Sequence, residues 1–379
     1  MNKLLSLFFI GFSLLTMAQD GTNNPFGKGL VNVMAKDSSW STKMSFRFQS
    51  RYDGSYDLGA DSFSDEAYVR RARIKGSGFA FSPKIKYKFE YDVANGYVLD
   101  AVLKYNFAGN FTLWFGQTKL PGNIERVFSS QKLQLVDRSL LNSKFTLDRD
   151  AGFQLRHHFK LGKTFLVREI FAVCQGEGLN ARNKDFEVTS NGHGYTGRIE
   201  LLPFGEFTKK GDYFASDLKR EESPKLMVSA TYDYNQNAML TRGQKGSQIA
   251  SGNFRDLQTI FVDAHFKYAG FSCFGEYVNR QTTNGSAVVD QAAGEVYYTG
   301  ASLNLQMGYL MKNNWEIAGR YTQVTPEEQT GNNNINQYTL GFSRYVVGHN
   351  LKIQGDIGFT QEVNKNDMLL IRLQTEFNF

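Results

Sequence analysis

Residues 84–92 read Lys-Ile-Lys-Tyr-Lys-Phe-Glu-Tyr-Asp, so charged and apolar side chains alternate without a break. A β-strand directs successive side chains to opposite faces, and this stretch therefore predicts a strand with one apolar face and one charged face. The same alternation recurs from about residue 43 to the last residue, and it is clear at 97–107, 351–360 and 369–379. The chain is therefore predicted to be all-β.

The alternating stretches are long, and their connections are of two kinds. Many strands run about ten residues or more, whereas soluble strands usually have five or six, and tilted strands of this length cross a bilayer. Tight turns such as 95–96 and 284–285 contrast with long polar connections at 176–192 and 241–253, which is the pattern of an outer-membrane barrel. We predict about sixteen strands, at 43–52, 66–76, 83–92, 97–107, 111–118, 151–160, 164–174, 193–202, 225–234, 256–268, 271–281, 295–310, 314–323, 336–347, 350–360 and 367–379.

Composition distinguishes a membrane barrel from a soluble β-sandwich. The 379 residues include 32 Phe, 19 Tyr and 3 Trp, yet mean hydropathy is −0.40. A lipid-facing aromatic exterior and a polar lumen explain both values. The chain also ends Phe377-Asn378-Phe379, and a soluble sandwich has no reason for such an ending. Because unpaired strand edges are costly in hydrocarbon, we predict a closed transmembrane antiparallel β-barrel.

The N-terminus resembles an export signal. A short basic start, residues 1–3, precedes the almost wholly apolar stretch 4–15, which is too short to span a membrane. We therefore predict a cleaved signal peptide at 1–18, a periplasmic lead at 19–42 and a barrel at 43–379 in the outer membrane of a Gram-negative bacterium. Outer-membrane lipid is then the surrounding partner, and nucleic acid is not a partner because an exported barrel never meets the genome.

Two cationic stripes are predicted to face the lumen. Their side chains are Arg71, Arg73, Lys75, Lys84, Lys86 and Lys88. At mid-membrane, a cation on the lipid face would cost roughly 2–4 kcal/mol, so the lumen is their expected place. The two strands are joined by a short connection, and we expect the stripes to lie side by side. Such stripes favour anions, although Glu90, Asp92 and Asp100 keep open an ordinary lumen of mixed charge.

Residues 119–148 interrupt the alternation. About thirty residues are too many for a simple turn. The segment and its end contain Lys119, Arg126, Arg138 and Arg149, interspersed with acidic residues. Two interpretations are open from these residues alone: a segment that folds inward and narrows the pore, or a solvated surface loop. We interpret it as a pore-constricting loop.

Six segments, taken in order, resemble a known family. They are Ala-Tyr-Val-Arg-Arg-Ala-Arg-Ile-Lys at 67–75, Phe-Gly-Gln-Thr-Lys-Leu-Pro at 115–121, Glu-Arg at 125–126, Ser-Ser at 129–130, Asp-Arg-Ser-Leu at 137–140 and Asp-Arg-Asp-Ala-Gly at 148–152. In this order the chain is similar to the phosphate-selective porins O and P. The resemblance covers about residues 40–160, and the ordered set is more specific than any one of its members.

The resemblance implies a sixteen-stranded barrel, usually a homotrimer, through which small anions such as phosphate or polyphosphate diffuse passively. It also implies an inward-folded loop and lumen cations that guide the anion. The residues that match by segment are Arg71, Arg73 and Lys75 in the lumen, and Lys119, Arg126, Arg138 and Arg149 in the loop region. The match leaves open which of the latter guide the anion and which hold the loop through Glu125, Asp137, Asp148 or Asp150.

Other kinds of site find little support in the sequence. No local Ser–His pair suits an outer-membrane lipase, so we predict neither an enzyme nor a cofactor. His157 and His158 lie on opposite faces of a strand and cannot chelate one metal ion together, so we predict no metal site. The alternative function is a barrel that acts mainly as a surface adhesin or membrane-organising protein, with long loops that bind a partner.

Overall fold

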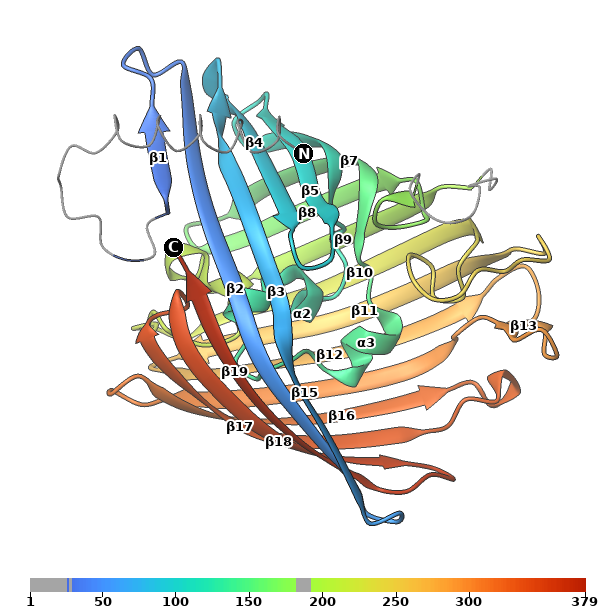
Figure 1. Cartoon of the computed structure of the whole chain (residues 1–379). Coiled ribbons are helices and arrows are strands. Elements are labelled where there is room, and N and C mark those ends of the chain that lie inside the picture. The colour runs from blue at the N-terminus through green and yellow to red at the C-terminus, as the bar shows by residue number, and fades with distance from the viewer. Residues whose placement is uncertain (1–25, 27–28, 182–191) are drawn as a thin grey trace, which may run out of the picture.

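A closed antiparallel ring of sixteen strands forms the molecule (Figure 1). The computed structural model describes residues 26, 29–181 and 192–379, so the predicted signal peptide lies outside the described residues. Strands β2–β12 and β15–β19 follow one another around the ring, and β19 pairs with β2 to close it. The prediction of an all-β barrel of about sixteen strands is confirmed.

The ring strands overlap all sixteen predicted stretches. They are β2 (Trp40–Asp57), β3 (Ser62–Ala80), β4 (Ser82–Asp92), β5 (Tyr97–Asn106), β6 (Phe111–Lys119), β7 (Arg149–Leu161), β8 (Phe165–Cys174), β9 (Gly194–Leu202), β10 (Lys225–Ala238), β11 (Arg255–Tyr268), β12 (Phe271–Thr282), β15 (Gly300–Leu310), β16 (Trp315–Pro326), β17 (Ile335–Val347), β18 (Leu351–Glu362) and β19 (Met368–Asn378). Outside the ring, β1 (Val31–Met34) pairs with the first residues of β2.

One strand prediction needs correction. The stretch 295–310 is two strands, because β14 (Glu295–Val296) pairs with β13 (Val288–Asp290) in a separate small sheet, and only β15 joins the ring. Tyr297 lies between them, and its hydroxyl donates to the carbonyl of Ala238 at 2.6 Å. This buried tyrosine interrupts the alternation, because its side chain fastens the connection to a neighbouring loop.

The apolar face of each strand points outward. On β15, Leu305, Met307 and Tyr309 are each about half exposed, whereas Asn304 and Gln306 on the opposite face are buried. The same division holds around the ring, where many large apolar side chains are exposed and most buried ones on the strands are polar or charged. Lipid therefore covers the outer rows, and the polar rows line the interior.

Connection length distinguishes the two ends of the barrel. The end that carries the chain terminus has tight turns, at 81, 107–110, 162–164, 269–270, 311–314 and 348–350. The opposite end has the long connections, together with the short turns 58–61 and 93–96, and in membrane barrels the end with the shorter connections faces the periplasm. The exception is the connection 203–224, which is long although it lies at the short-turn end.

The segment between β6 and β7 lies inside the barrel, as Figure 1 shows for α2 (Ile124–Val127) and α3 (Leu140–Phe145). We call residues 120–148 the inner loop; it also contains the 3₁₀ turn η1 (Ser130–Lys132). Gln134 Nε2 donates to Glu316 Oε1 at 2.8 Å, and α3 packs against β12, β15 and β16. That the inner loop narrows the path of a solute stays a prediction.

A second segment enters the barrel from the periplasmic end. We call residues 203–224 the inner strap; it contains the 3₁₀ segment η3 (Thr208–Tyr213). Lys267 Nζ, from the wall, donates to two strap carbonyls, those of Gly211 and Ser216, at 2.8 and 2.7 Å. Strap and loop share one apolar cluster, formed by Ile124, Phe128, Leu133, Leu166, Leu202, Phe207, Ala215, Met227 and Phe274.

The inner loop and inner strap together divide the lumen. They lie against β9–β12 and β15–β18, which we call the covered wall. The inner face of strands β3–β7, which we call the open wall, lines two hollows. None of the helices that the described residues form is long and apolar enough to cross a membrane.

Candidate functional site

Two connected hollows run along the open wall. The first, about 540 Å³, lies at mid-barrel between the open wall and the inner loop. The second, about 700 Å³, continues toward the periplasmic end beside the inner strap. Both are lined by Lys104, Trp114, Arg156, Lys210 and Tyr213, so the two hollows adjoin, and we call them together the passage.

All ten residues proposed from the sequence face this passage. Lys84 and Lys86 line the second hollow. The other eight line the first hollow: Arg71, Arg73, Lys75, Lys88, Lys119, Arg126, Arg138 and Arg149. The fold therefore brings together side chains from two wall strands and from the loop region, which are up to 78 positions apart between Arg71 and Arg149.

The expectation that the two stripes lie side by side is wrong. Strands β3 and β4 form an antiparallel hairpin around Phe81, with a register shift between Phe79 and Ala80. Lys75 is opposite Glu90, and Lys88 is opposite Ser77. The two stripes consequently follow one another along the barrel axis, because a hairpin pairs the far end of one strand with the far end of the other.

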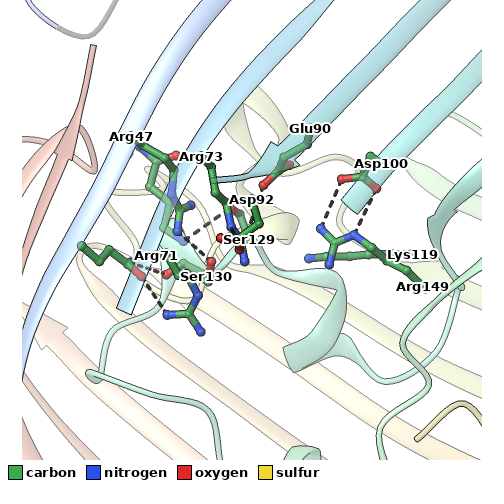
Figure 2. Close-up of polar contacts among 12 residues, drawn as sticks. Arg47, Arg71, Arg73, Glu90, Asp92, Asp100, Lys119, Ser129, Ser130 and Arg149 are labelled. Carbon is green, nitrogen blue, oxygen red and sulfur yellow. Dashed lines mark hydrogen bonds and ion pairs between the residues drawn. The ribbon is translucent and has the colours of Figure 1, made fainter. Parts of the chain in front are cut away.

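Carboxylates neutralise part of the open wall. Arg73 bonds Glu90 and Asp92 through two nitrogens, each at 3.0 Å. Lys88 Nζ lies 2.7 Å from Asp100 Oδ2, which also receives Arg149 Nη2 at 3.2 Å. Figure 2 shows Arg149 directed at Asp100, with Lys119 beside it. These ion pairs fix the positions of the cations, and the carboxylates cancel part of their positive charge.

The inner loop holds its own cations differently. Lys119 Nζ donates to the carbonyls of Arg126, Val127 and Phe128 at 2.8, 3.2 and 2.8 Å. Arg138 donates to the carbonyls of Glu125 and Phe128 at 3.0 and 2.8 Å. Carbonyls at the end of a helix attract cations, and they bring no negative charge to Lys119 or Arg138.

The structure gives the contacts of the four cations of the loop region. Arg126 pairs with Asp148, and Arg149 pairs with Asp100, so both help to fix the ends of the inner loop. Lys119 and Arg138 hold the loop through its carbonyls and have no carboxylate within 4.0 Å in the described part of the chain. Position in the motif alone could not separate these two roles.

Asp137 of the inner loop anchors a cluster of wall arginines. Its carboxylate lies 2.6 Å from Arg51, 3.6 Å from Arg70 and 4.0 Å from Arg71. Burial acts to raise the pKa of Asp137, but these guanidinium groups outweigh it and lower that pKa below its ordinary value. Figure 2 shows a second tie nearby, where Arg47 reaches Ser130 of the loop, with Nη2–Oγ 2.9 Å.

The cationic lining is larger than the sequence analysis proposed. Lys104, Lys132, Arg156 and Lys210 also line the first hollow. Lys104 and Arg156 lie on the charged faces of alternating strands, so the same rule that selected Lys75 could have found them. Lys210 could not be found in that way, because no alternation marks the inner strap.

The first hollow is strongly unbalanced in charge. Twelve cations and two carboxylates line it. Seven of the twelve have no carboxylate within 4.0 Å among the residues described: Lys75, Lys104, Lys119, Lys132, Arg138, Arg156 and Lys210. Within those residues there is also no group of three or more side chains able to hold a metal ion. The passage therefore presents a positive field to any solute.

Comparison with known proteins identifies the family. A family model described as phosphate-selective porin O and P matches residues 42–368. An uncharacterized protein of Aquifex aeolicus (strain VF5) is 24% identical over 351 residues, which cover 82% of this chain and 80% of that protein.

Solved structures share the barrel. Pseudomonas putida OprB has 8% identity and a TM-score of 0.58, covering 89% of this chain and 94% of its own. An anion-selective porin from Comamonas acidovorans has 9% identity and a TM-score of 0.58, covering 90% and 100%. Salmonella typhi OmpF in complex with daunomycin has 14% identity and a TM-score of 0.56, covering 92% and 100%. At these identities the likeness concerns the fold alone.

Proposed function

Because this chain belongs to the phosphate-selective porin O and P family and is an outer-membrane porin, we propose that it lets small anions diffuse passively through the passage along its open wall. The observation that carries the proposal is the charge of the first hollow, where twelve cations face two carboxylates. Rings and stripes of Lys and Arg favour anions in pores.

The passage acts by attraction and partial dehydration. An anion that enters from outside meets the positive field of the seven cations without carboxylate partners, which raises its local concentration. In the first hollow the inner loop lies opposite the open wall, so cations face the anion from both sides. Polar donors then replace part of the water that the anion leaves behind, and no reaction or cofactor is needed.

The family description and the resemblance make phosphate the first solute to test, with polyphosphate next. A homotrimer embedded in outer-membrane lipid is the assembly that the resemblance implies, and we include it in the proposal. The Comamonas acidovorans porin is described as anion-selective, which supports an anion path on a barrel of this shape. The prediction of a signal peptide at 1–18 fits export to this membrane.

The test is the reversal potential of the purified barrel in a planar bilayer with a salt gradient. We expect chloride to pass more readily than potassium. Lys84→Gln with Lys86→Gln should weaken this preference without unfolding the barrel, because no bond or ion pair in the described residues depends on either ammonium group. A preference for potassium would contradict the proposal, and a silent barrel would favour the surface-adhesin alternative.

A further inference from the structure

The cations around the passage differ in whether their hydrogens are free. Those of Lys119 and Arg138 are donated to loop carbonyls, and those of Arg73 and Arg149 to wall carboxylates. Lys119 donates to three carbonyls, so it would have to break a bond within the protein to donate to an anion. Each of the three arginines has two of its three nitrogens bonded and keeps one for a solute. These four groups therefore contribute mainly an attracting field.

A second set of cations keeps its donors. Among the described residues, neither Lys104 Nζ nor Lys210 Nζ donates to any protein atom. Arg156 donates only Nη2, to Gln154 Oε1 at 2.9 Å, and its Nε is buried without an acceptor. These three cations line both hollows, so they surround the junction of the passage.

Trp114 holds two of these cations in place. Lys104 Nζ lies 3.6 Å from the centre of the indole ring, and the guanidinium carbon of Arg156 lies 3.9 Å from it. The two come from β5 and β7, the strands on either side of β6, which carries Trp114. A π face attracts a cation without adding a negative charge, so the tryptophan positions both groups and leaves them able to bind an anion.

The inner strap supplies the third cation at a conformational cost. Lys209 and Lys210 adopt left-handed φ angles of 51° and 61°, which residues with a side chain seldom adopt. The strap is fastened on both sides of this point, through Asp212 to Arg168 at 2.5 Å and through Thr208 Oγ1 to Glu221 at 2.8 Å. Strained backbone held by its surroundings is typical of functional positions, and here it presents Lys210 to the passage.

We propose that Lys104 and Arg156, which Trp114 positions, form with Lys210 of the inner strap an oxyanion-binding site on the periplasmic side of the inner loop, and that the loop motif supplies mainly the attracting field. This inference rests on the proposed function, since it concerns an anion already in the passage. The ligand class is a divalent oxyanion, because several oxygens can accept from three converging cations at once. Chloride has one negative charge and relieves less of their mutual repulsion.

The first experiment measures how phosphate blocks chloride current in single channels. In the unaltered chain, the block should saturate as phosphate is added. Lys104→Gln and Arg156→Gln should each raise the half-blocking concentration by about tenfold, as expected for a lost charged hydrogen bond. The matched control is Lys132→Gln, which removes a cation that rests on the ring of Phe214 at 3.5 Å and lines only the first hollow.

The control decides where binding takes place. We expect Lys132→Gln to lower the preference for chloride over potassium, because it removes a positive charge that attracts anions. The half-blocking concentration of phosphate should stay within about twofold of its original value, because Lys132 is not a hydrogen-bond donor at the junction of the two hollows. Equal effects of Lys132→Gln and Lys104→Gln would overturn the proposed site. A chloride preference with no saturable block would also overturn it while leaving the proposed function intact.

Trp114 provides a readout that needs no current. The chain has three tryptophans, so Trp40→Phe with Trp315→Phe leaves Trp114 as the only indole. Phosphate, and sulfate as a second divalent oxyanion, should change its fluorescence saturably, and Arg156→Gln should abolish the change. Trp114→Leu should weaken phosphate block while keeping the chloride preference, because both charges remain. Fluorescence that does not respond to either oxyanion would refute binding at Trp114 even in a silent barrel.

Discussion

The open wall and the covered wall carry the same kinds of inward side chain but use them differently. On the covered wall, Arg198 lies 2.8 Å from both Asp263 and Glu200, and all three side chains are almost fully buried. On the open wall, Lys75 and Lys104 have no such carboxylate among the described residues. One wall stabilises the fold with its charges, and the other faces a passage with them.

Contact with the two inner segments creates this difference. Lys352 Nζ and Gln354 Nε2, from the covered wall, donate to the carbonyls of Leu133 and Gln134 in the inner loop. The inner strap binds Lys267 of the covered wall in the same way, through the carbonyl of Gly211. A charge that is removed from water needs a partner, whereas a charge beside a water-filled passage does not. The number of protein groups that bind a cation therefore distinguishes a cation that stabilises the fold from one that is available to a solute.

The largest expected effect is on the covered wall. Arg198→Gln leaves Asp263 and Glu200 buried without their cation, and it should lower the free energy of unfolding by about 3–5 kcal/mol. Urea unfolding in detergent micelles measures this. The control, Lys365→Gln, removes a 2.7 Å pair with Glu362 whose lysine is 60% exposed, and it should cost less than about 1 kcal/mol. Similar losses in both variants would remove the distinction between the walls.

The next largest effect is expected at the apolar cluster that the inner loop shares with the inner strap, which we call the joint. Phe128 is fully buried, and its ring lies 5.5 Å from that of Phe274. Phe128→Ala should cost about 3 kcal/mol of packing and loosen the inner loop. Faster hydrogen exchange at 120–148 and noisier current are expected. Phe107→Ala on the lipid-facing side, where the ring is half exposed, should change neither; a quiet channel in Phe128→Ala would show that the joint does not hold the loop.

On the open wall, a single charge should affect selectivity and not stability. Lys75→Gln should change the free energy of unfolding by less than about 0.5 kcal/mol, since no ion pair is lost. The anion-to-cation permeability ratio should fall by roughly twofold, because a nearby unit charge in a watery passage is worth under about 1 kcal/mol. A variant that unfolds but keeps its selectivity would place Lys75 with the structural cations.

The smallest expected effect is a pH dependence. Burial lowers the pKa of Lys132 to about 8, helped by the charges of Lys219 and Lys88. A lysine is cationic below its pKa, so the anion preference should decline slightly as pH rises through about 8. Lys132→Arg should remove this part of the decline, because arginine stays charged. Reversal potentials recorded on both sides of that pH test it, and an identical decline in Lys132→Arg would point to another group.

The barrel itself could be predicted from local sequence. Alternation identified every ring strand, because a two-residue period, lipid outside and water inside are properties of each strand alone. The chain also placed Lys75 and Lys88 on the inner face for the same reason. The exceptions are local too: β2 and β3 slip by one residue at Arg70, and Tyr297 interrupts 295–310.

Only the tertiary structure decided what each inner side chain does. Whether a cation is neutralised depends on cross-strand register, which sets Arg73 opposite Asp92, and what else it binds depends on contacts between distant residues, such as Lys352 with Leu133. The inner strap has no periodic pattern, and its place in the lumen follows from packing against Phe128 and its neighbours. The two-residue period and the polarity of each face are set by residues close together in the sequence. Strand register and the packing of the inner segments depend on residues far apart in the chain, so only the tertiary structure determines them.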